Sequence, residues 1–386
     1  MRYFKGYRRK KGRPGVRNYI AVIATVTCAN VVAQNIAARS SAGIAVTHDT
    51  GCLEFGEDRA LTERTIKGMA LQPNAGAAIF VGLGCEQIDT EKLASEITDK
   101  PCAAVIIQKA GGSSAAVREG AKIVKTFEKI IEKQERETFS TEELIVAVKC
   151  GGSDFTNAVA SNPGLGCAMD TLVEKGGTAI LTETSGFPGS EHVLAEQAIN
   201  GEVAKKIWEI VDQYRGEVKE KFNLNINDGN PSPGNIAGGI TTLVEKSLGN
   251  IRKGGSTPIQ GVLEFAEQIG SRKGLWIMDT PGHDIFSLAG AAAGGAQILA
   301  FTTGRGSPLG CALVPVIKIC ACKNTVNQMG ENIDLDLSGV MEGKQDLLQA
   351  GEEVFNKIVE TASGELTATE KLEHFEFAIP RLCRTL

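Results

Sequence analysis

The 386-residue chain lacks several features that would place it in a membrane or nucleic-acid class. No apolar run approaches the roughly 18 residues that cross a bilayer. The chain has no excess of positive charge, because 41 Lys and Arg residues stand against 46 Asp and Glu residues, for a formal net charge of -5. Nucleic acids and anionic membrane surfaces are usually bound by a basic patch. The composition therefore argues against both kinds of partner.

The start of the chain lacks the apolar core of a secretory signal. It reads "MRYFKGYRRKKGRPGVRNY" and is basic, but no apolar segment of the signal-peptide type follows. We therefore do not expect secretion. A nuclear or RNA-binding role for "RRKKGR" is also disfavoured, because the chain runs from there directly into an apolar, strand-like segment.

Common cofactor and nucleophile motifs are missing too. There is no G-x-G-x-x-G opening the first helix, no G-x-x-x-x-G-K-[ST] and no G-x-S-x-G. Nicotinamide, P-loop and hydrolase-elbow functions therefore have little support. No C-x-x-C pair suggests a structural zinc site.

Glycine and cysteine, by contrast, are plentiful. The 45 glycines cluster after apolar runs and make up about 12% of the chain, against about 7% in an average protein. There are ten cysteines but only four histidines. A chain of this length is no small disulfide scaffold. We therefore expect reduced thiols in a cytoplasmic protein, some in the core and some acting as ligands or acid–base groups.

Short apolar runs alternate with segments of helical periodicity. The runs are continuous, as expected for strands covered on both faces, and lie at residues 19–26, 43–47, 77–83, 102–108, 144–148, 178–182, 274–279, 296–302 and 312–318. This succession predicts an α/β fold with mainly parallel sheets flanked by helices.

Two domains are expected. The polar segment 133–143 has no periodic apolar face and marks the boundary between an N-terminal α/β domain, 1–138, and a C-terminal catalytic α/β domain, 139–386. Residues 223–258 are rich in Gly, Pro and Asn. We expect them to form an ordered functional loop that opens a helix.

Polar and titratable side chains gather where the predicted strands end. Ligands of open parallel sheets bind beyond the carboxyl ends of the strands. The residues found there are His48, Cys52, Cys85, Glu86, Cys150, Ser153, Asp154, Glu183, Thr303, Arg305 and, within the last run, Lys318. Glycine alone would suffice for turns, so this concentration predicts a site shared by the two domains. Three other cysteines beside or inside apolar runs are expected in the core: Cys28, Cys102 and Cys320.

The motifs in order resemble the altronate/galactarate dehydratase family. They are "GYRRKKGRPGVRNYI", "THDTGC", "VGLGCE", "CGGSDFTNAVASNPGLG", "NPSPGNIAGGITTLVEKSLG", "MDTPG" and "FTTGRGSPLG". The resemblance implies dehydration of a sugar acid, most simply D-altronate, to a 2-keto-3-deoxy acid with iron(II) or manganese(II). It covers the large catalytic part of longer members without their small N-terminal domain. It therefore implies a separate small subunit, and we also expect a homo-oligomer.

The chemistry of the implied elimination suggests roles for these residues. Elimination needs a base, a carboxylate anchor and charge stabilisation. His48 or Glu183 is the candidate base, and Arg305 and Lys318 are candidates to hold the substrate carboxylate. The candidate metal ligands are His48, Cys52, Cys85, Glu86, Cys150 and Asp154. The candidates for binding substrate hydroxyls are Ser153, Asn230, Ser232, Asn235 and Thr303.

Alternatives stay open at this point. The segment "ETSGFPGSEH" has Gly186 near the position where the dehydratases carry a second acid, and "THDTGCLEFGED" is closer to the sulfolactate sulfo-lyase style. A large subunit that releases sulfite from (2R)-sulfolactate is therefore the first alternative. An iron–sulfur hydro-lyase using Cys52, Cys85 and Cys150 is the second. A non-catalytic subunit that binds sugar acids is the third.

Overall fold

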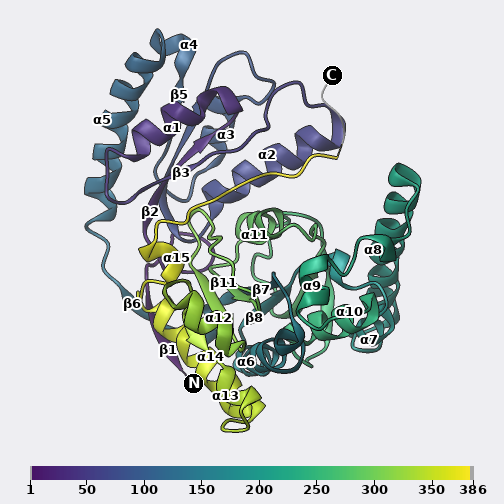
Figure 1. The fold of residues 1–386 in the computed structure, drawn as a ribbon. Coiled ribbons are helices and arrows are strands. Elements are labelled where there is room, and N and C mark those ends of the chain that lie inside the picture. Colours follow the sequence, from purple (N-terminus) through teal and green to yellow (C-terminus); the bar gives the residue numbers. More distant parts are fainter. Residues whose placement is uncertain (1, 383–386) are drawn as a thin grey trace.

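The computed structural model describes residues 2–382 and contains two parallel sheets, each flanked by helices (Figure 1). The smaller sheet has the order β3-β2-β4-β5, with neighbouring strands parallel. It consists of β2 (Tyr19–Ala24), β3 (Gly43–Val46), β4 (Ala75–Gly82) and β5 (Cys102–Ile106). The expected α/β class with mainly parallel sheets is confirmed.

Helices cover both faces of the smaller sheet. Ile20 and Val22 of β2 share a core with α1 (Asn30–Ala37) and α5 (Ser113–Ile131). The alternate residues Ala21 and Ile23 share another core with α2 (Gly56–Leu71). Successive side chains of a strand point to opposite faces, which is why the run is apolar throughout. Two short helices complete this part: α3 (Thr90–Glu96) and α4 (Ile107–Ala110).

The larger sheet has seven parallel strands in the order β13-β12-β11-β7-β8-β10-β9. They are β7 (Ile145–Cys150), β8 (Thr178–Leu181), β9 (Ile259–Leu263), β10 (Gly274–Met278), β11 (Ile298–Thr302), β12 (Val316–Cys320) and β13 (Leu335–Asp336). The chain builds the β8 side first and then crosses β7 to build the β11 side. The strand order therefore reverses between β7 and β11, where open sheets bind their ligands.

Helices pack on both faces of this sheet as well. One face is covered by α6 (Asn162–Glu174), α8 (Gly201–Phe222) and α14 (Leu347–Ala362). On the other face lies α11 (Asp284–Ala293), which packs against α2 of the smaller part. The remaining helices are α7 (Glu191–Glu196), α9 (Pro233–Ala237), α10 (Leu243–Ile251), α12 (Lys323–Gln328), α13 (Ser338–Met341) and α15 (Ala368–Lys371).

The two parts share one hydrophobic core. Phe80 of β4 and Met69 of α2 belong to the same buried cluster as Leu288 of α11 and Phe301 of β11. A short antiparallel pair, β1 (Tyr3–Gly6) with β6 (Glu137–Ser140), lies at the junction. The boundary expected at residue 138 falls inside β6.

The C-terminal segment ties the parts together. It runs from α15 back toward α2 (Figure 1), where Arg381 lies 3.4 Å from the Glu54 carboxylate. Nearer to α15, Glu370 forms a buried ion pair with Arg17, with Nε and Oε1 2.6 Å apart. These contacts join sequence segments more than 300 residues apart.

The structure corrects several local expectations. The last apolar run, 312–318, forms a strand only from residue 316, and β9 was not predicted at all. Segment 223–258 contains α9 and α10, so it does open a helix. Cys320 is buried as expected, but Cys28 is exposed and the core assignment was wrong there.

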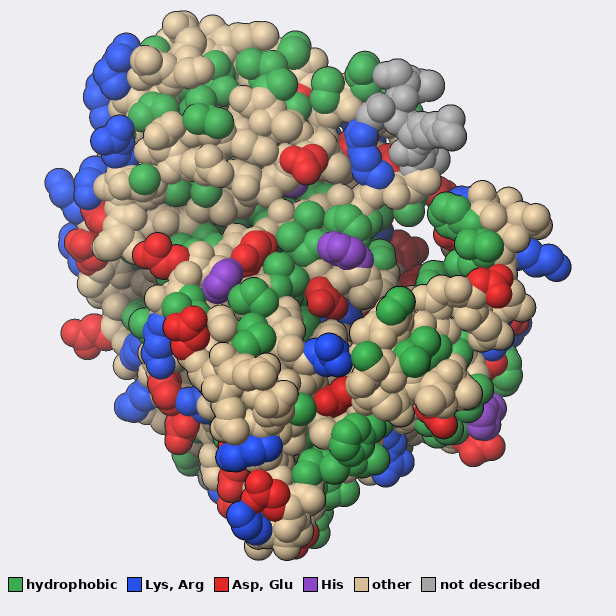
Figure 2. All heavy atoms as spheres, viewed as in Figure 1, with side chains coloured by type: hydrophobic (Ala, Val, Ile, Leu, Met, Phe, Trp, Pro, Cys, Tyr) green, Lys and Arg blue, Asp and Glu red, His purple; other side chains and the backbone are tan. Residues whose placement is uncertain are grey.

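The surface view and the helices bear on possible partners. On the face drawn in Figure 2, basic and acidic side chains are interspersed, so no single basic patch covers it. Among residues 2–382, no helix is long and apolar enough to cross a membrane.

Candidate active site

A buried ionic cluster lies at the carboxyl ends of β7 and β8. Lys149, the fifth residue of β7, places its Nζ 2.9 Å from Oε1 of Glu183 and 2.9 Å from Oδ1 of Asp284. Glu183 follows β8, and Asp284 is the first residue of α11. The Lys149 side chain is 2% exposed. Because β7 borders the point where the strand order reverses, this cluster lies where a ligand is expected.

A second lysine completes the surroundings of Glu183. Lys253 is fully buried, and its Nζ lies 3.3 Å from Oε2 of Glu183. It also donates to the backbone oxygen and the side-chain oxygen of Asn250. The Cys150 thiol lies between these groups, 3.0 Å from Oδ1 of Asn250 and 3.6 Å from Oε2 of Glu183. The Glu183 carboxylate is therefore held between two ammonium groups.

These contacts set the protonation states. Burial alone would lower the pKa of Lys149, but the charges of Glu183 and Asp284 raise it above its ordinary value. Burial likewise opposes ionisation of Glu183, yet Lys149 and Lys253 hold its pKa below the ordinary value. Burial raises the pKa of the Cys150 thiol, and the Glu183 charge adds to the rise. Cys150 is therefore a protonated thiol at neutral pH.

Glu183 adopts an unusual backbone conformation. Its φ is 78° in the left-handed region, which a non-glycine residue rarely adopts without compensation. The backbone N–H of Glu183 donates to Oγ1 of Thr280 at 2.8 Å, and the next residue, Thr184, donates to the Asp279 carboxylate at 2.6 Å. The loop after β10 thus holds the strained residue in place and points its carboxylate at the lysines.

Lys246 of α10 borders the cluster on the side of α9. Lys246 of α10 is partly buried, and its Nζ lies 2.6 Å from Oδ1 of Asn230 and 3.0 Å from Oδ1 of Asn235. The Asp284 side chain is 30% exposed. Burial lowers the pKa of Lys246, which makes its ammonium group a readier proton donor. Two amides and one lysine therefore border the cluster on this side.

Three loops on this side of the cluster pack on one another. The Asn235 amide donates to the backbone oxygen of Ser153 at 2.9 Å, and the backbone N–H of Arg305 donates to the oxygen of Gly152 at 2.9 Å. A side chain at Gly304 would overlap the Asp154 carboxylate, so glycine is required there. The loops 150–154, 230–238 and 303–306 thus come together at the site.

Lys318 lies on the same face of the sheet. It pairs in register with Phe301, which pairs with Lys149. The Lys318 Nζ is 3.5 Å from the centre of the Phe301 ring and has no hydrogen-bond partner among the described residues. Burial lowers the pKa of Lys318 to about 7. Its amine therefore loses its charge far more readily than an ordinary lysine does.

Comparisons with known proteins identify the family. The family model "D-galactarate/Altronate dehydratase, C-terminal" matches residues 141–385, and "D-galactarate dehydratase/Altronate hydrolase, second domain" matches residues 6–132. The chain belongs to the D-galactarate/altronate dehydratase family. The expected resemblance is confirmed, and the ionic cluster lies wholly within the C-terminal match.

Curated relatives of this dehydratase-family chain carry two kinds of name. Subunit beta of the (2R)-sulfolactate sulfo-lyase of Chromohalobacter salexigens is 36% identical over 384 residues, which are 99% of this chain and 98% of the relative. The altronate dehydratase of Bacillus subtilis is 33% identical over 98% of this chain and 77% of its own length. The galactarate dehydratase (L-threo-forming) of Escherichia coli is 30% identical over 94% of this chain and 73% of its own length. The relatives make this chain an enzyme of the lyase kind.

The N-terminal candidates do not join the cluster. Both ring nitrogens of the buried His48 have partners in its own domain, the Ala24 oxygen at 2.8 Å and the Thr50 hydroxyl at 2.7 Å. The Glu86 carboxylate accepts backbone N–H groups of the loop after β4 and the hydroxyls of Thr25 and Thr90. Cys52 and Cys85 are exposed.

The ligand set expected for a metal is therefore not assembled. Among residues 2–382, no three His, Cys, Asp or Glu side chains are grouped so that they could hold a metal ion. The set expected for an iron–sulfur cluster, Cys52, Cys85 and Cys150, forms no such group either. Asp154 is engaged by the Thr156 hydroxyl at 2.6 Å and the Asn157 N–H at 3.0 Å. The protein side chains as arranged do not fit an ion held by protein ligands alone.

Sequence reasoning found Glu183 and Cys150 but missed five members of the cluster: Lys149, Lys246, Asn250, Lys253 and Asp284. Lys149 had a detectable signal, because it is a lysine inside an apolar strand, as Lys318 is. Asp284 ends the "DTPGHD" segment after β10, and Lys246 and Asn250 lie in "EKSLGN". Lys253 follows α10, and nothing in its local sequence distinguishes it from a surface lysine.

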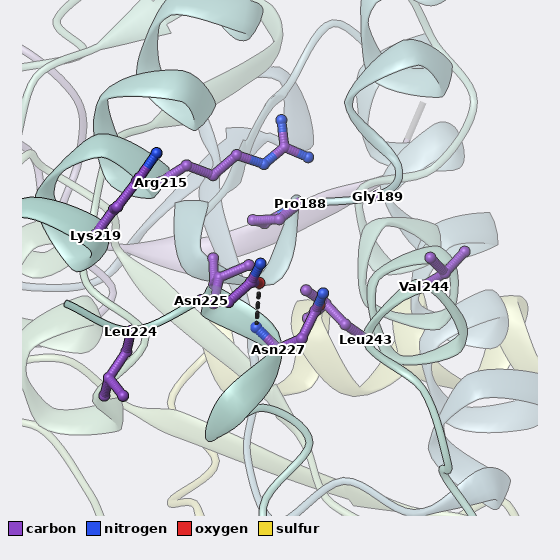
Figure 3. A pocket seen from close by; sticks show the side chains of 10 residues that line it. Pro188, Gly189, Arg215, Lys219, Leu224, Asn225, Asn227, Leu243 and Val244 are labelled. Atoms are coloured by element: carbon purple, nitrogen blue, oxygen red, sulfur yellow. Dashed lines mark hydrogen bonds between the residues drawn. The ribbon is translucent and has the colours of Figure 1, made fainter. Parts of the chain in front are cut away.

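A separate pocket of about 380 Å³ lies between the end of α8 and the start of α10 (Figure 3). Arg215 and Lys219 project from α8, and Leu243 and Val244 form the opposite wall. None of the ionic cluster lines this pocket. The Arg215 guanidinium is already paired with Glu191 at 2.6 Å. The charged chemistry therefore points to the strand ends rather than to this pocket.

Proposed function

We propose that this protein is the catalytic large chain of a lyase that dehydrates a sugar acid to a 2-keto-3-deoxy acid, with D-altronate as the first substrate to test. The observation that supports it most is the buried Lys149–Glu183–Lys253 cluster at the reversal point of the larger sheet. The family assignment supports the reaction class.

The cluster carries the charges that such an elimination needs. Removal of the proton alpha to a carboxylate leaves an enediolate, which preorganised cations stabilise in a site that excludes water. Three lysines, Lys149, Lys246 and Lys253, face two carboxylates, Glu183 and Asp284, so one formal positive charge is left over. A substrate carboxylate supplies the missing negative charge.

Glu183 is the proposed base. Its pKa is low in the free protein because two lysines surround it. A substrate carboxylate that binds Lys149 and Lys253 competes for the same ammonium groups and adds a nearby negative charge. Both effects raise the pKa of Glu183 on binding, which makes it basic only when substrate is present. His48 is not the base in this proposal, since both of its ring nitrogens are bonded within its own domain.

Other residues complete the proposed reaction. Lys246 donates a proton to the departing hydroxyl, which its lowered pKa favours. Arg305 is exposed on the loop that packs against Gly152 and first contacts the substrate carboxylate. Lys318 lies against the Phe301 ring and, because burial lowers its pKa to about 7, adds only part of a positive charge at neutral pH. Asn235, held by Ser232 at 2.9 Å, keeps Lys246 in position, while Asn230, Ser153 and Thr303 line the hydroxyl-binding side.

Iron(II) or manganese(II) stays a prediction of the family resemblance, and no step above passes through a metal. When bound, such an ion would supply Lewis-acid stabilisation of the enediolate. Dialysis against a chelator followed by activity assays tests it. Activity that is lost and then restored by either ion supports the prediction, and activity retained at a metal content below stoichiometric contradicts it.

Sulfite release from (2R)-sulfolactate is the second candidate function. It is favoured by one observation: the sulfo-lyase subunit is 36% identical to this chain, whereas the two dehydratases are 33% and 30% identical. The same base and lysines serve both reactions, because each begins with loss of the proton alpha to a carboxylate. They differ in the leaving group, since sulfite departs without protonation by Lys246.

The partners and the compartment follow from the same proposal. The relative named subunit beta supports a separate small subunit for this chain. We also expect a homo-oligomer in the cytoplasm, where the nine free cysteines of the described part would stay reduced.

A substrate screen tests the proposal. Purified protein, with and without a candidate small subunit, is offered aldonic acids, aldaric acids and (2R)-sulfolactate, and both 2-keto acid and sulfite are measured. Keto acid from D-altronate without sulfite supports dehydration. Sulfite together with keto acid from sulfolactate supports the second candidate. Turnover that is unchanged in Glu183→Gln contradicts the proposed base.

A further inference from the structure

A second charged cluster lies at the opposite ends of the strands. It lines a pocket of about 80 Å³ beside Pro73, which precedes β4, and Ile145, the first residue of β7. Both residues mark amino ends of strands, whereas the ionic cluster of the candidate active site lies at carboxyl ends. The charged side chains that line the pocket are Arg9, Lys11, Arg13, Asp99 and Lys100. Three of the cations, Arg9, Lys11 and Arg13, belong to the "RRKKGR" run, which the lyase function leaves unexplained.

The positive charges of this pocket are poorly compensated. Arg9 donates only to neutral oxygens, those of Pro73, Arg17, Asn18 and Gln134, and has no ion pair among the described residues. The buried Lys100 donates to the Gln72 oxygen at 2.9 Å, and its nearest carboxylate oxygen, on Asp99, is 3.9 Å away. Burial lowers the pKa of Arg9 to about 10 and that of Lys100 to about 7.

Only Arg13 is fully paired, with Glu143 at 3.0 Å. Four cations thus face two carboxylates, Asp99 and Glu143. Burying charge without a partner costs free energy, and an anion in the pocket would offset that cost. The Lys100 ammonium group has N–H donors left for it, since it makes one short hydrogen bond.

Asp99 adds a second, independent indication. Its Oδ1 is buried and has no hydrogen-bond partner among the described residues. A carboxylate in an anion site repels most anions, but it accepts a hydrogen bond from an anion that carries its own O–H. Hydrogen phosphate has such a group, and sulfate at neutral pH does not. A site with a buried acceptor strongly disfavours the analogue that lacks the matching donor.

We propose that this pocket binds a hydrogen phosphate group, either as inorganic phosphate or as the phosphate of a metabolite. Lys11, Lys100 and Arg9 supply the positive charge, and Asp99 Oδ1 accepts the P–OH hydrogen. The pocket has room for two to three waters at about 30 Å³ each, which suits a tetrahedral oxyanion. Its walls come from both parts of the chain, so the anion bridges the smaller and larger sheets. The site stands apart from the proposed lyase chemistry.

Thermal unfolding with millimolar phosphate or sulfate at matched ionic strength tests the site. A ligand that binds only the folded state raises its melting temperature. Phosphate should raise the Tm of the wild type by about 2 °C or more, and sulfate should have a much smaller effect. Titration calorimetry with inorganic phosphate gives the affinity, and glucose 6-phosphate tests the metabolite source.

Neighbouring lysines provide a matched control. Lys11→Gln should weaken phosphate binding at least fivefold, whereas Lys10→Gln, an exposed change that does not line the pocket, should leave it unchanged. Asp99→Asn should reduce the preference for phosphate over sulfate. Equal Tm shifts with phosphate and sulfate would overturn the proposal. So would equal affinities of the Lys10→Gln and Lys11→Gln variants for phosphate. Neither result depends on whether the chain turns over a sugar acid.

Discussion

Replacing Lys149 tests the buried ionic cluster most directly. Its Nζ lies 2.9 Å from a carboxylate oxygen of Glu183 and 2.9 Å from one of Asp284. Removing one partner of a buried ion pair costs about 3–5 kcal/mol. Glu183 keeps Lys253 at 3.3 Å, and Asp284 can reach water because its side chain is 30% exposed. We therefore expect Lys149→Met to lower the free energy of unfolding by about 3 kcal/mol, the low end of that range.

Activity should fall further than stability alone explains. Losing one preorganised group that stabilises a developing oxyanion lowers turnover by about 10²–10³-fold, and we expect a loss of that size for Lys149→Met. Denaturant titrations give the stability, and steady-state kinetics with the substrate found in the screen give the rate. The double variant Lys149→Met/Asp284→Asn should recover part of the stability, since it removes an uncompensated carboxylate, without recovering turnover.

Lys205→Met is the matched control. Lys205 forms an exposed pair with Glu209 on α8 at 3.3 Å, and such pairs contribute less than about 1 kcal/mol. This variant should keep both stability and turnover. If Lys149→Met behaved like Lys205→Met in both measurements, the assignment of the cluster as the reaction centre would be refuted.

Three further predictions concern buried charges. Arg17→Met should lower stability by about 3–5 kcal/mol because it breaks the buried pair with Glu370, whereas Arg64→Met, at an exposed pair with Glu264, should cost less than about 1 kcal/mol in the same denaturant titrations. Burial alone would raise the pKa of Glu370, but Arg17 holds it below the ordinary value. The pair therefore stabilises the fold at pH values above the pKa of an unfolded glutamate, about 4.3. This stabilisation is lost as the pH falls through the lower pKa that Glu370 has in the folded state. Arg17→Met should therefore reduce the dependence of Tm on pH at acidic pH. Because burial lowers the pKa of Lys318 to about 7, the free energy of unfolding should increase as the pH rises from 7 toward 10. In denaturant titrations, Lys318→Met should therefore be more stable than the wild type by the largest margin at pH 6 and by the smallest margin near pH 10.

The fold could be predicted well because most strands are apolar on both faces. Runs such as 144–148 and 178–182 allow no other placement than the interior of a parallel sheet. β9 was not predicted because it is an edge strand with alternating burial, and its sequence, "IQGVL", mixes polar and apolar residues. The β12 run was placed too early, because residues 312–314 are apolar and buried without belonging to a strand.

The candidate site could be predicted only in part. The rule that ligands lie beyond the carboxyl ends of strands directed attention to Cys150 and Glu183. It treated all strand ends alike, however, and therefore grouped His48 and Glu86 with them. Which ends meet depends on the strand order, because β7 and β11 border the reversal point and β8 lies next to β7. Lys253 reaches Glu183 through tertiary packing, which no local pattern reveals.

The core shared by the two sheets limits how this chain can be divided experimentally. The family matches end at residue 132 and resume at 141, which invites expression of the second match alone. Such a fragment would expose α11 residues such as Leu288, which are buried against α2 in the whole chain, and large exposed apolar patches favour aggregation. A soluble catalytic fragment would therefore require redesign of that face, and truncation libraries of this gene should yield insoluble products when cut at the junction.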